Sequence, residues 1–171
     1  MAGWAPMASD LHTERLRLGP WQDSDLDAYD AMVRERDPRT AAASRDGSRE
    51  ALSASIVRQQ ASITEPGLGV LAVRMLEGFA GYCGLVVGQA SIEEPEIAFE
   101  LLIACQGRGI ATEAAMATVE AARTTGRFRL WATVRSWNEA SFRVLDKVGF
   151  ERTERIITDD FGDTVWCTRL L

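Results

Sequence analysis

The segment from residue 100 to residue 115, ELLIACQGRGIATEAA, constrains the fold of this chain more than any other part of it. An apolar, strand-like run leads through a glycine-containing turn into an alanine-rich stretch, which predicts a helix over residues 109–125. The first N–H groups of a helix lack internal partners and carry the positive end of its dipole, so they favour bound phosphate. Gly107 and Gly109 have no Cβ and would let a pyrophosphate approach the backbone, while Arg108 adds a cation.

The same residues could also form only a tight turn between a strand and a helix. Their spacing matches neither the GxxxxGK loop of Walker-type nucleotide sites nor the GxGxxG of dinucleotide folds. The segment therefore predicts a phosphate-binding loop of another kind, with the simple turn as the alternative.

The other strands are predicted from alternating or continuous apolar runs that end at turn residues. In LHTERLRL, apolar and polar residues alternate and predict one strand over residues 11–18, which Gly19 and Pro20 end. A meander of three antiparallel strands is expected next, followed by a single strand and a final hairpin closed by DDFGD. These strands are expected at residues 68–77, 79–88, 96–103, 128–134, 150–157 and 164–170.

Helices are predicted where apolar residues recur at helical spacing behind a capping residue. Ser24 and Asp27 suggest a capping box for a helix that Asp37 and Pro38 end, and Asn138 suggests the cap of another. Besides this helix and the one at residues 109–125, helices are expected at residues 48–60 and 138–148, and a loop that could move over a ligand at residues 39–47. This element order predicts an α/β (α+β) fold, a mixed sheet with helices on both faces.

Length and charge exclude several other classes of protein. With 171 residues, 46% of them apolar, the chain suffices for one domain, expected over residues 11–171 behind a flexible arm of residues 1–10. The net charge of −6 and the lack of Lys or Arg blocks argue against nucleic acid and anionic membranes as partners.

The cysteines and the N-terminus indicate a compartment. Three widely spaced cysteines without a CxxC pair predict free thiols in a reducing cytoplasm, and with one histidine no metal site is expected. The chain starts without an export signal and contains no apolar run long enough for a membrane span. A cytoplasmic protein is therefore expected.

Three segments together resemble the GNAT N-acetyltransferases. The first, EIAFELLIACQGRGIATEA, is similar to the strand, pyrophosphate loop and helix of that family, with Gln106, Gly109 and Ala111 at the three positions of its loop pattern. TERLRLGPW, residues 13–21, looks like the first strand of the branch related to the RimJ/RimL ribosomal-protein N-terminal acetyltransferases. WNEASFRVLDKVGF, residues 137–150, looks like a third motif of that branch. The three segments occur in the order of the family and span most of the chain.

This resemblance implies a cofactor and the residues that would hold it. It implies a mostly antiparallel sheet of about seven strands that is splayed where acetyl-CoA binds, without a metal. The pantetheine arm would pair with the backbone of the splayed strand, whose amides could also stabilise an oxyanion at the thioester carbonyl. The residues implied for the pantetheine arm are Leu101, Leu102, Ile103 and Asn138, and those for the pyrophosphate are Gln106, Gly107, Arg108, Gly109, Ile110, Ala111 and Thr112.

Two proton-transfer roles are implied for direct attack of an amine on the thioester. Ser141 matches a serine of the branch and is expected to donate a proton to the leaving thiolate; the alternative is a solvated or capping serine. Glu96 and Glu100 fall on one face of a strand, where period-two geometry also places Ala98, and could draw a proton from an ammonium group through water. The alternative for both carboxylates is a partly solvated sheet face.

Two functions remain open at this stage. The first is an N-acetyltransferase acting on a primary amine, either a protein N-terminus, such as that of a ribosomal protein, or a small amine, such as an antibiotic or a polyamine. The second is a non-catalytic module that uses the same fold to bind or sense acyl-CoA. In either case, the resemblance implies a monomer or a homodimer.

Overall fold

The described residues form one eight-stranded mixed sheet flanked by helices. The computed structural model describes residues 3–43 and 46–171. The order of strands across the sheet is β1-β2-β3-β4-β5-β6-β8-β7, and neighbours pair antiparallel except β5 and β6, which are parallel. The strands are β1 (Leu11–His12), β2 (Arg17–Gly19), β3 (Gly69–Met75), β4 (Gly78–Val86), β5 (Glu96–Leu101), β6 (Arg129–Arg135), β7 (Glu151–Asp159) and β8 (Gly162–Leu170).

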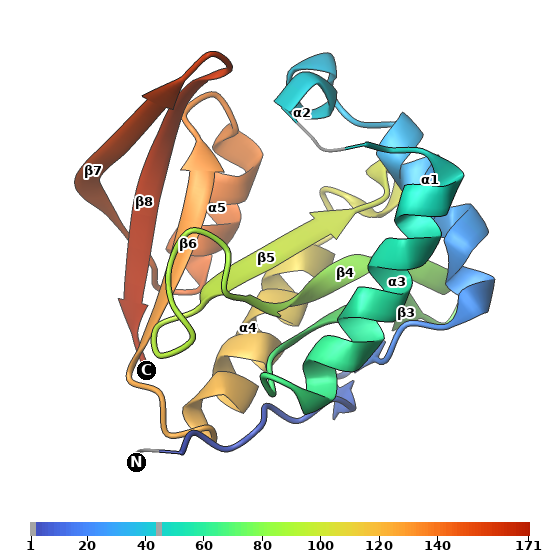
Figure 1. Cartoon of the computed structure of the whole chain (residues 1–171), viewed down its shortest axis with the longest axis horizontal. Coiled ribbons are helices and arrows are strands. Elements are labelled where there is room, and N and C mark those ends of the chain that lie inside the picture. Colours follow the sequence, from blue (N-terminus) through green and yellow to red (C-terminus); the bar gives the residue numbers. More distant parts are fainter. Residues whose placement is uncertain (1–2, 44–45) are drawn as a thin grey trace.

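Helices cover both faces of the sheet, which confirms the predicted fold class (Figure 1). The alternation along β3 shows how the sequence separates the faces: Leu71 and Val73 join the larger core with α4, whereas Val70 and Ala72 join a smaller cluster with α3. The helices are α1 (Leu26–Arg34), α2 (Pro38–Ala43), α3 (Arg49–Thr64), α4 (Ile110–Arg123) and α5 (Glu139–Lys147), with short 3-10 turns at Asp23–Asp25 and Ile103–Cys105.

The sheet opens between β5 and β6. In the part of the chain that the structure describes, one register pair joins these strands, Glu96 with Trp131. Beyond that pair β5 runs away from β6, so the C-terminal end of β5 lacks a neighbour on that side (Figure 1). The predicted splay of the sheet is therefore present, and it positions the candidate site.

The first predicted strand is wrong as a single element. Residues 11–18 form a small hairpin in which Leu11 pairs with Leu18, and the Thr13 N–H donates to the Leu16 carbonyl at 2.9 Å to make the turn. Alternation of apolar and polar residues is the same in one strand and in two short paired strands, so the pattern could not reveal the turn. The hairpin contributes two strands to the eight of the sheet, where about seven were expected.

Three boundaries between elements also differ from the prediction. Ser24 and Asp27 do not form the expected capping box; instead, the Gln22 N–H donates to the Asp25 carboxylate at 2.8 Å before α1. Pro38 opens the short helix α2 where a loop was predicted, because proline suits the first position of a helix; residues 44 and 45 of that loop lie outside the described residues. The strand expected to reach residue 103 ends at Leu101, where a 3-10 turn follows.

The N-terminal arm is docked against the domain over residues 5–7, contrary to the expected flexible arm. The Ala5 N–H donates to the Thr125 carbonyl at 3.0 Å, and the Met7 N–H donates to the Gly67 carbonyl at 2.8 Å. The Met7 side chain is 4% exposed and belongs to the larger core. Backbone pairing and burial of Met7 together hold a segment that composition alone marked as a tail.

Replacing Met7 by alanine should therefore destabilise the protein by roughly 2–4 kcal/mol, because the substitution removes a buried side chain and leaves a cavity. Met116, on α4, is 57% exposed and provides the matched control. Met116→Ala should change the free energy of unfolding by less than about 0.5 kcal/mol. Urea unfolding of both variants measures the difference, and equal small effects would mean that the arm is not part of the core.

Within residues 3–43 and 46–171, the structure contains no helix both long and apolar enough to cross a membrane.

Candidate functional site

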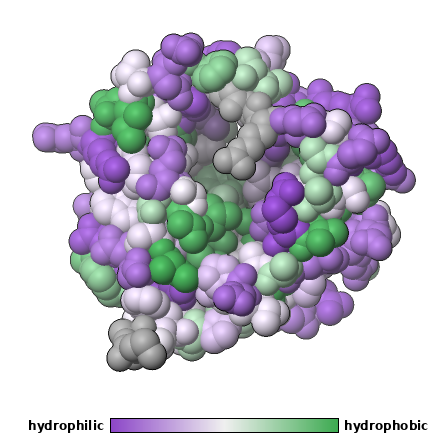
Figure 2. All heavy atoms as spheres, in the orientation of Figure 1, coloured by the Kyte–Doolittle hydropathy of each residue, from purple (hydrophilic) through white to green (hydrophobic). Residues whose placement is uncertain are grey.

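A cleft of about 930 Å³ lies where β5 and β6 diverge. Its walls come from the end of α1, from α2, from β4 and β5, from the N-terminus of α4, and from α5 with the turn before it. Figure 2 shows the surface hollowed in this region between α5 and α1. The cleft is thus open to solvent and bounded by both sides of the splayed sheet.

The turn before α4 has the geometry of an anion cradle. Gly107 and Gly109 adopt left-handed φ values of 71° and 77°, and Gly109 is the N-cap of α4. The first intrahelical bond at this end runs from the Glu113 N–H to the Gly109 carbonyl at 3.0 Å, so the preceding helical N–H groups lack helical acceptors. A Cβ on Gly107 would meet nothing within 4 Å. Open space above free N–H groups at a helix N-terminus fits a pyrophosphate.

Most residues predicted for the pyrophosphate line this cleft, and Arg108 is the exception. Arg108 is not among the described residues that line it, and its carbonyl accepts a hydrogen bond from Arg15 at 2.9 Å. The lining residues from this prediction are Gln106, Gly107, Gly109, Ile110, Ala111 and Thr112.

The segment predicted to pair with the pantetheine arm already has several internal hydrogen bonds. The Leu102 N–H donates to Ala80 of β4 at 2.9 Å, and Leu102 is not among the described residues that line the cleft. Leu101 does line it, but its carbonyl accepts from the Gln106 side chain at 3.1 Å. The Ile103 N–H donates to the Glu35 carboxylate at 3.1 Å inside the cleft. A ligand pairing with the Ile103 amide would have to share or displace Glu35.

Asn138 and Ser141 lie together at the first turn of α5 and both line the cleft. The Ser141 N–H donates to Asn138 Oδ1 at 3.1 Å, which confirms the predicted N-cap. Within the described residues, the Ser141 hydroxyl has no hydrogen bond to the protein. This half-buried hydroxyl is free to bond with a ligand in the cleft.

Glu100 lines the cleft as one member of a polar cluster. The Arg36 guanidinium binds both of its carboxylate oxygens, with Nε–Oε1 and Nη2–Oε2 distances of 2.7 and 2.6 Å, and the Tyr82 hydroxyl donates to Oε2 at 2.9 Å. The hydrogen bond to Glu100 holds the pKa of Arg36 above its ordinary value. Burial first, and then the charge of Glu100, raise the pKa of Tyr82 well above its ordinary value, so Tyr82 remains a donor.

Glu96 lies on the same sheet face as Glu100 but at the other end of β5. The predicted face is correct, since Ile97 and Leu101 belong to the core on the opposite face. Glu96 is 5% exposed, and its carboxylate accepts hydrogen bonds from the Gln89 N–H and, at 2.6 Å, from the Thr133 hydroxyl. It lies outside the set of described residues that line the cleft. Its contacts join β5 to β6 where the splay begins.

Sequence reasoning missed two polar side chains of the cleft, Glu35 and Arg36, and it also missed the contact between Arg39 and Trp137. The Arg39 guanidinium carbon lies 4.1 Å from the centre of the Trp137 ring, so α2 touches the turn before α5. Arg36 reaches Glu100 across a sequence separation of 64 residues. No local pattern connects residues so far apart, whereas the glycine loop and the helix cap are local and were found.

Replacing Arg36 by methionine should destabilise the fold by roughly 2 kcal/mol, between the values typical of exposed and of buried ion pairs. The reason is that Glu100 would lose the guanidinium that binds both of its carboxylate oxygens, in a pair whose side chains are only 15% and 21% exposed. The control is Arg34→Met, which breaks an ion pair with Asp30 on α1 in which Arg34 is 75% exposed. That variant should change the free energy of unfolding by less than about 0.5 kcal/mol. Equal losses in urea unfolding would contradict the prediction.

Among the residues that the structure describes, no group of three or more His, Cys, Asp or Glu side chains is arranged to hold a metal ion.

Comparison with known proteins identifies the family. Residues 15–151 match the family model described as acetyltransferase (GNAT) domain, while no curated protein sequence matches significantly. Among solved structures, a GnaT-family acetyltransferase from Bordetella pertussis is 26% identical, with a TM-score of 0.79 over 95% of this chain and 99% of that chain.

Two further structures share the fold at lower identity. RimJ from Mycobacterium smegmatis in complex with CoA-disulfide is 20% identical, with a TM-score of 0.72 over 98% of this chain and 88% of that chain. RimL, a ribosomal L7/L12 alpha-N-protein acetyltransferase in complex with coenzyme A, is 16% identical, with a TM-score of 0.77 over 95% and 98%. Because the family model covers residues 15–151, most of the sequence, the chain belongs to the GNAT family of acetyltransferases.

Proposed function

We propose that the protein transfers the acetyl group of acetyl-CoA to a primary amine. The observation that carries this proposal is the cradle formed by Gly107, Gly109 and the N-terminus of α4, which opens into the cleft beside the free Ser141 hydroxyl. Unpaired helical N–H groups suit a pyrophosphate, and the cleft extends from them along the unpaired end of β5. RimL was solved in complex with coenzyme A and RimJ in complex with CoA-disulfide, and the shared fold supports the same class of cofactor here.

The chain would supply binding and proton transfer, and the cosubstrate would supply the activated acetyl group. The N-terminus of α4 would hold the pyrophosphate, and the Ile103 N–H, after release from Glu35, would be available to a carbonyl group of the cosubstrate. A neutral amine attacks the thioester carbon and the carbon–sulfur bond breaks. The thiolate takes a proton from the Ser141 hydroxyl, directly or through water, and the proton lost by the amine restores that hydroxyl.

Glu100 and Glu35 would place negative charge on the acceptor side of the cleft. Both line it, and Glu100 remains tied to Arg36 and Tyr82, so we assign it the orientation of the acceptor rather than direct proton abstraction. Glu96 was expected to share the proton-accepting role; its position outside the lining residues favours a role in holding β5 and β6.

A peptide N-terminus or another amine of modest pKa suits such a site. The ordinary pKa of an α-amino group is about 8, against about 10.4 for lysine, so more of it is neutral at pH 7 and less help from a base is needed. The name of RimL describes action on an alpha-amine of a ribosomal protein, which supports this class of acceptor without selecting one.

A two-step experiment tests the proposed function. Acetyl-CoA is first titrated against the wild-type protein, and a saturable rise in melting temperature is expected, because a ligand of the folded state stabilises it by RT ln(1 + [L]/Kd). Thiol release is then followed with N-terminal peptides, polyamines and aminoglycosides as acceptors. Binding without thiol release for any amine would favour the acyl-CoA-sensing module, and no binding at millimolar acetyl-CoA would overturn the proposal.

A further inference from the structure

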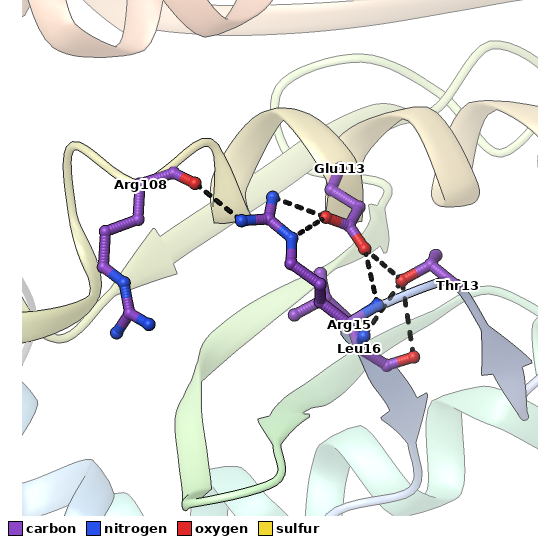
Figure 3. A network of polar contacts seen from close by, with 5 residues as sticks. All are labelled: Thr13, Arg15, Leu16, Arg108 and Glu113. Carbon is purple, nitrogen blue, oxygen red and sulfur yellow. Dashed lines mark hydrogen bonds and ion pairs between the residues drawn. The ribbon is translucent and has the colours of Figure 1, made fainter.

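A polar network connects the β1–β2 turn to the phosphate cradle (Figure 3). Arg15, in that turn, points its guanidinium between Glu113, in the first turn of α4, and the carbonyl of Arg108, in the cradle. The side chain of Arg108 points away from the network, so its backbone takes part and its charge does not. Arg15 is 93 residues from Arg108 and 98 residues from Glu113 in the sequence.

Arg15 makes short contacts with both Glu113 and the Arg108 carbonyl. Its Nε and Nη2 lie 2.7 and 2.6 Å from Glu113 Oε2, and its Nη1 donates to the Arg108 carbonyl at 2.9 Å. The Arg15 N–H donates to Glu113 Oε1 at 3.1 Å, and the Thr13 hydroxyl donates to the same oxygen. Glu113 is thus bound by the backbone and two side chains of the turn, which fixes the turn against α4.

The hydrogen bond from Arg15 to the Arg108 carbonyl holds the middle residue of the glycine turn. Arg108 lies between Gly107 and Gly109, and both glycines have left-handed φ values. Glycine loses more conformational freedom on folding than other residues, so a contact that holds a Gly-Arg-Gly turn offsets part of the cost of ordering it. Arg15 supplies such a contact on the middle residue, and its Nη2 lies 3.4 Å from the point where a Cβ on Gly109 would be.

Arg15 also balances a charge close to the cradle. The Glu113 carboxylate, in the first turn of α4, would offset the positive helix end that a pyrophosphate needs. Burial raises the pKa of Glu113, but the hydrogen bonds from Thr13 and Arg15 outweigh burial and leave the pKa below its ordinary value. The carboxylate is therefore charged at neutral pH, and the guanidinium beside it compensates that charge.

We propose that Arg15 is a positioning residue for the pyrophosphate of the cosubstrate, acting through the Arg108 carbonyl and through Glu113. This inference rests on the proposed function, because it assigns the cradle to acetyl-CoA. Arg15 orders the Gly107–Gly109 turn before the ligand arrives, and it screens the Glu113 charge. The expected consequence is a loss of affinity that is confined to the pyrophosphate part of the ligand.

The first test needs no ligand. Hydrogen exchange, followed by mass spectrometry, should be faster in Arg15→Ala than in the wild type for peptides covering residues 106–113, and unchanged for α3 and β8. The control is Arg17→Ala in β2, which breaks a more exposed ion pair, at 3.1 Å, with Asp10 just before β1. Arg17→Ala should leave exchange in residues 106–113 unchanged. Equal exchange in the wild type and Arg15→Ala would overturn the proposed ordering of the turn.

The second test compares two ligands by calorimetric titration. Arg15→Ala should bind CoA about ten- to a hundredfold more weakly than the wild type, the usual effect of losing a hydrogen bond from a charged group. S-acetylpantetheine, which lacks the pyrophosphate, should bind both proteins alike. Adding Glu113→Gln to Arg15→Ala should restore part of the CoA affinity, because it removes the uncompensated carboxylate.

The outcomes separate this inference from the proposed function. Equal losses of affinity for both ligands would make Arg15 a general structural residue, and unchanged affinity for CoA would also overturn the inference while leaving the proposed function intact. If the wild type binds neither ligand, the proposed function fails. The assignment to the pyrophosphate then fails with it, and hydrogen exchange still reports whether Arg15 orders the turn.

Discussion

Gly109→Val should abolish the stabilisation of the protein by acetyl-CoA, even at millimolar concentration. Gly109 has a φ of 77°, where a β-branched residue is strained by about 1–3 kcal/mol. Relief of this strain would move the N-terminus of α4, where the pyrophosphate is proposed to bind. A Cβ on Gly109 would also lie 3.4 Å from Arg15 Nη2, so the larger valine side chain would press on the contact that holds the turn. The measurement is the change in melting temperature with acetyl-CoA, supported by calorimetric titration.

Gly126 provides a matched control at the other end of α4. Its φ is 79°, and a Cβ there would meet nothing within 4 Å, so Gly126→Val imposes similar backbone strain away from the cleft. Both variants should melt at lower temperature than the wild type, but Gly126→Val should keep the full response to acetyl-CoA. If Gly109→Val fails to fold, Gly109→Ala provides a milder test with a smaller strain of about 1–2 kcal/mol. A folded Gly109 variant with wild-type affinity would mean that the cradle is only a turn.

Ser141→Ala should lower kcat for acetyl transfer by about a hundredfold, the lower range for loss of a positioned proton donor. The hydroxyl lines the cleft at the first turn of α5, and the Ser141 N–H rather than its side chain makes the cap with Asn138. Alanine keeps that N–H, so the helix and the affinity for acetyl-CoA should be unchanged. Steady-state thiol release with the best acceptor from the screen measures the effect.

Ser136, an exposed serine in the turn before α5, serves as the control for this variant. Ser136→Ala should keep both kcat and KM, since Ser136 is not among the described residues that line the cleft. A rise in KM for the acceptor with unchanged kcat in Ser141→Ala would indicate that the serine binds the acceptor and does not donate the proton. Unchanged kcat and KM would exclude both roles.

Features that depend on neighbouring residues could be predicted from the sequence. The glycine turn and the start of α4 follow from helix and turn preferences, and Asn138 was identified as a cap from its place before a helical pattern. Alternation along β5 correctly placed Glu96 and Glu100 on one face. Each of these inferences uses residues within a few positions of one another, where geometry is set by the local backbone.

Other features required the folded chain. The β1–β2 turn was hidden because alternation does not distinguish one strand from two paired ones. The docking of Met7 includes a backbone hydrogen bond to Gly67, which is distant in the sequence. The partners of Glu100 were also not foreseen: the sequence suggested a carboxylate that draws a proton from an ammonium group through water, whereas Arg36 and Tyr82 bind it in the structure.

The sequence by itself determined the family, the layered fold and the glycine turn before α4, because all three are encoded in local patterns: glycine positions, helical and period-two spacing, and capping residues. Only the tertiary structure decided which charges meet in and around the cleft. Arg36 reaches Glu100, and Arg15 reaches Glu113 and the Arg108 carbonyl, through the crossing of distant elements. Such pairs depend on how helices and strands pack in three dimensions, and packing over these separations leaves no periodic trace in one sequence.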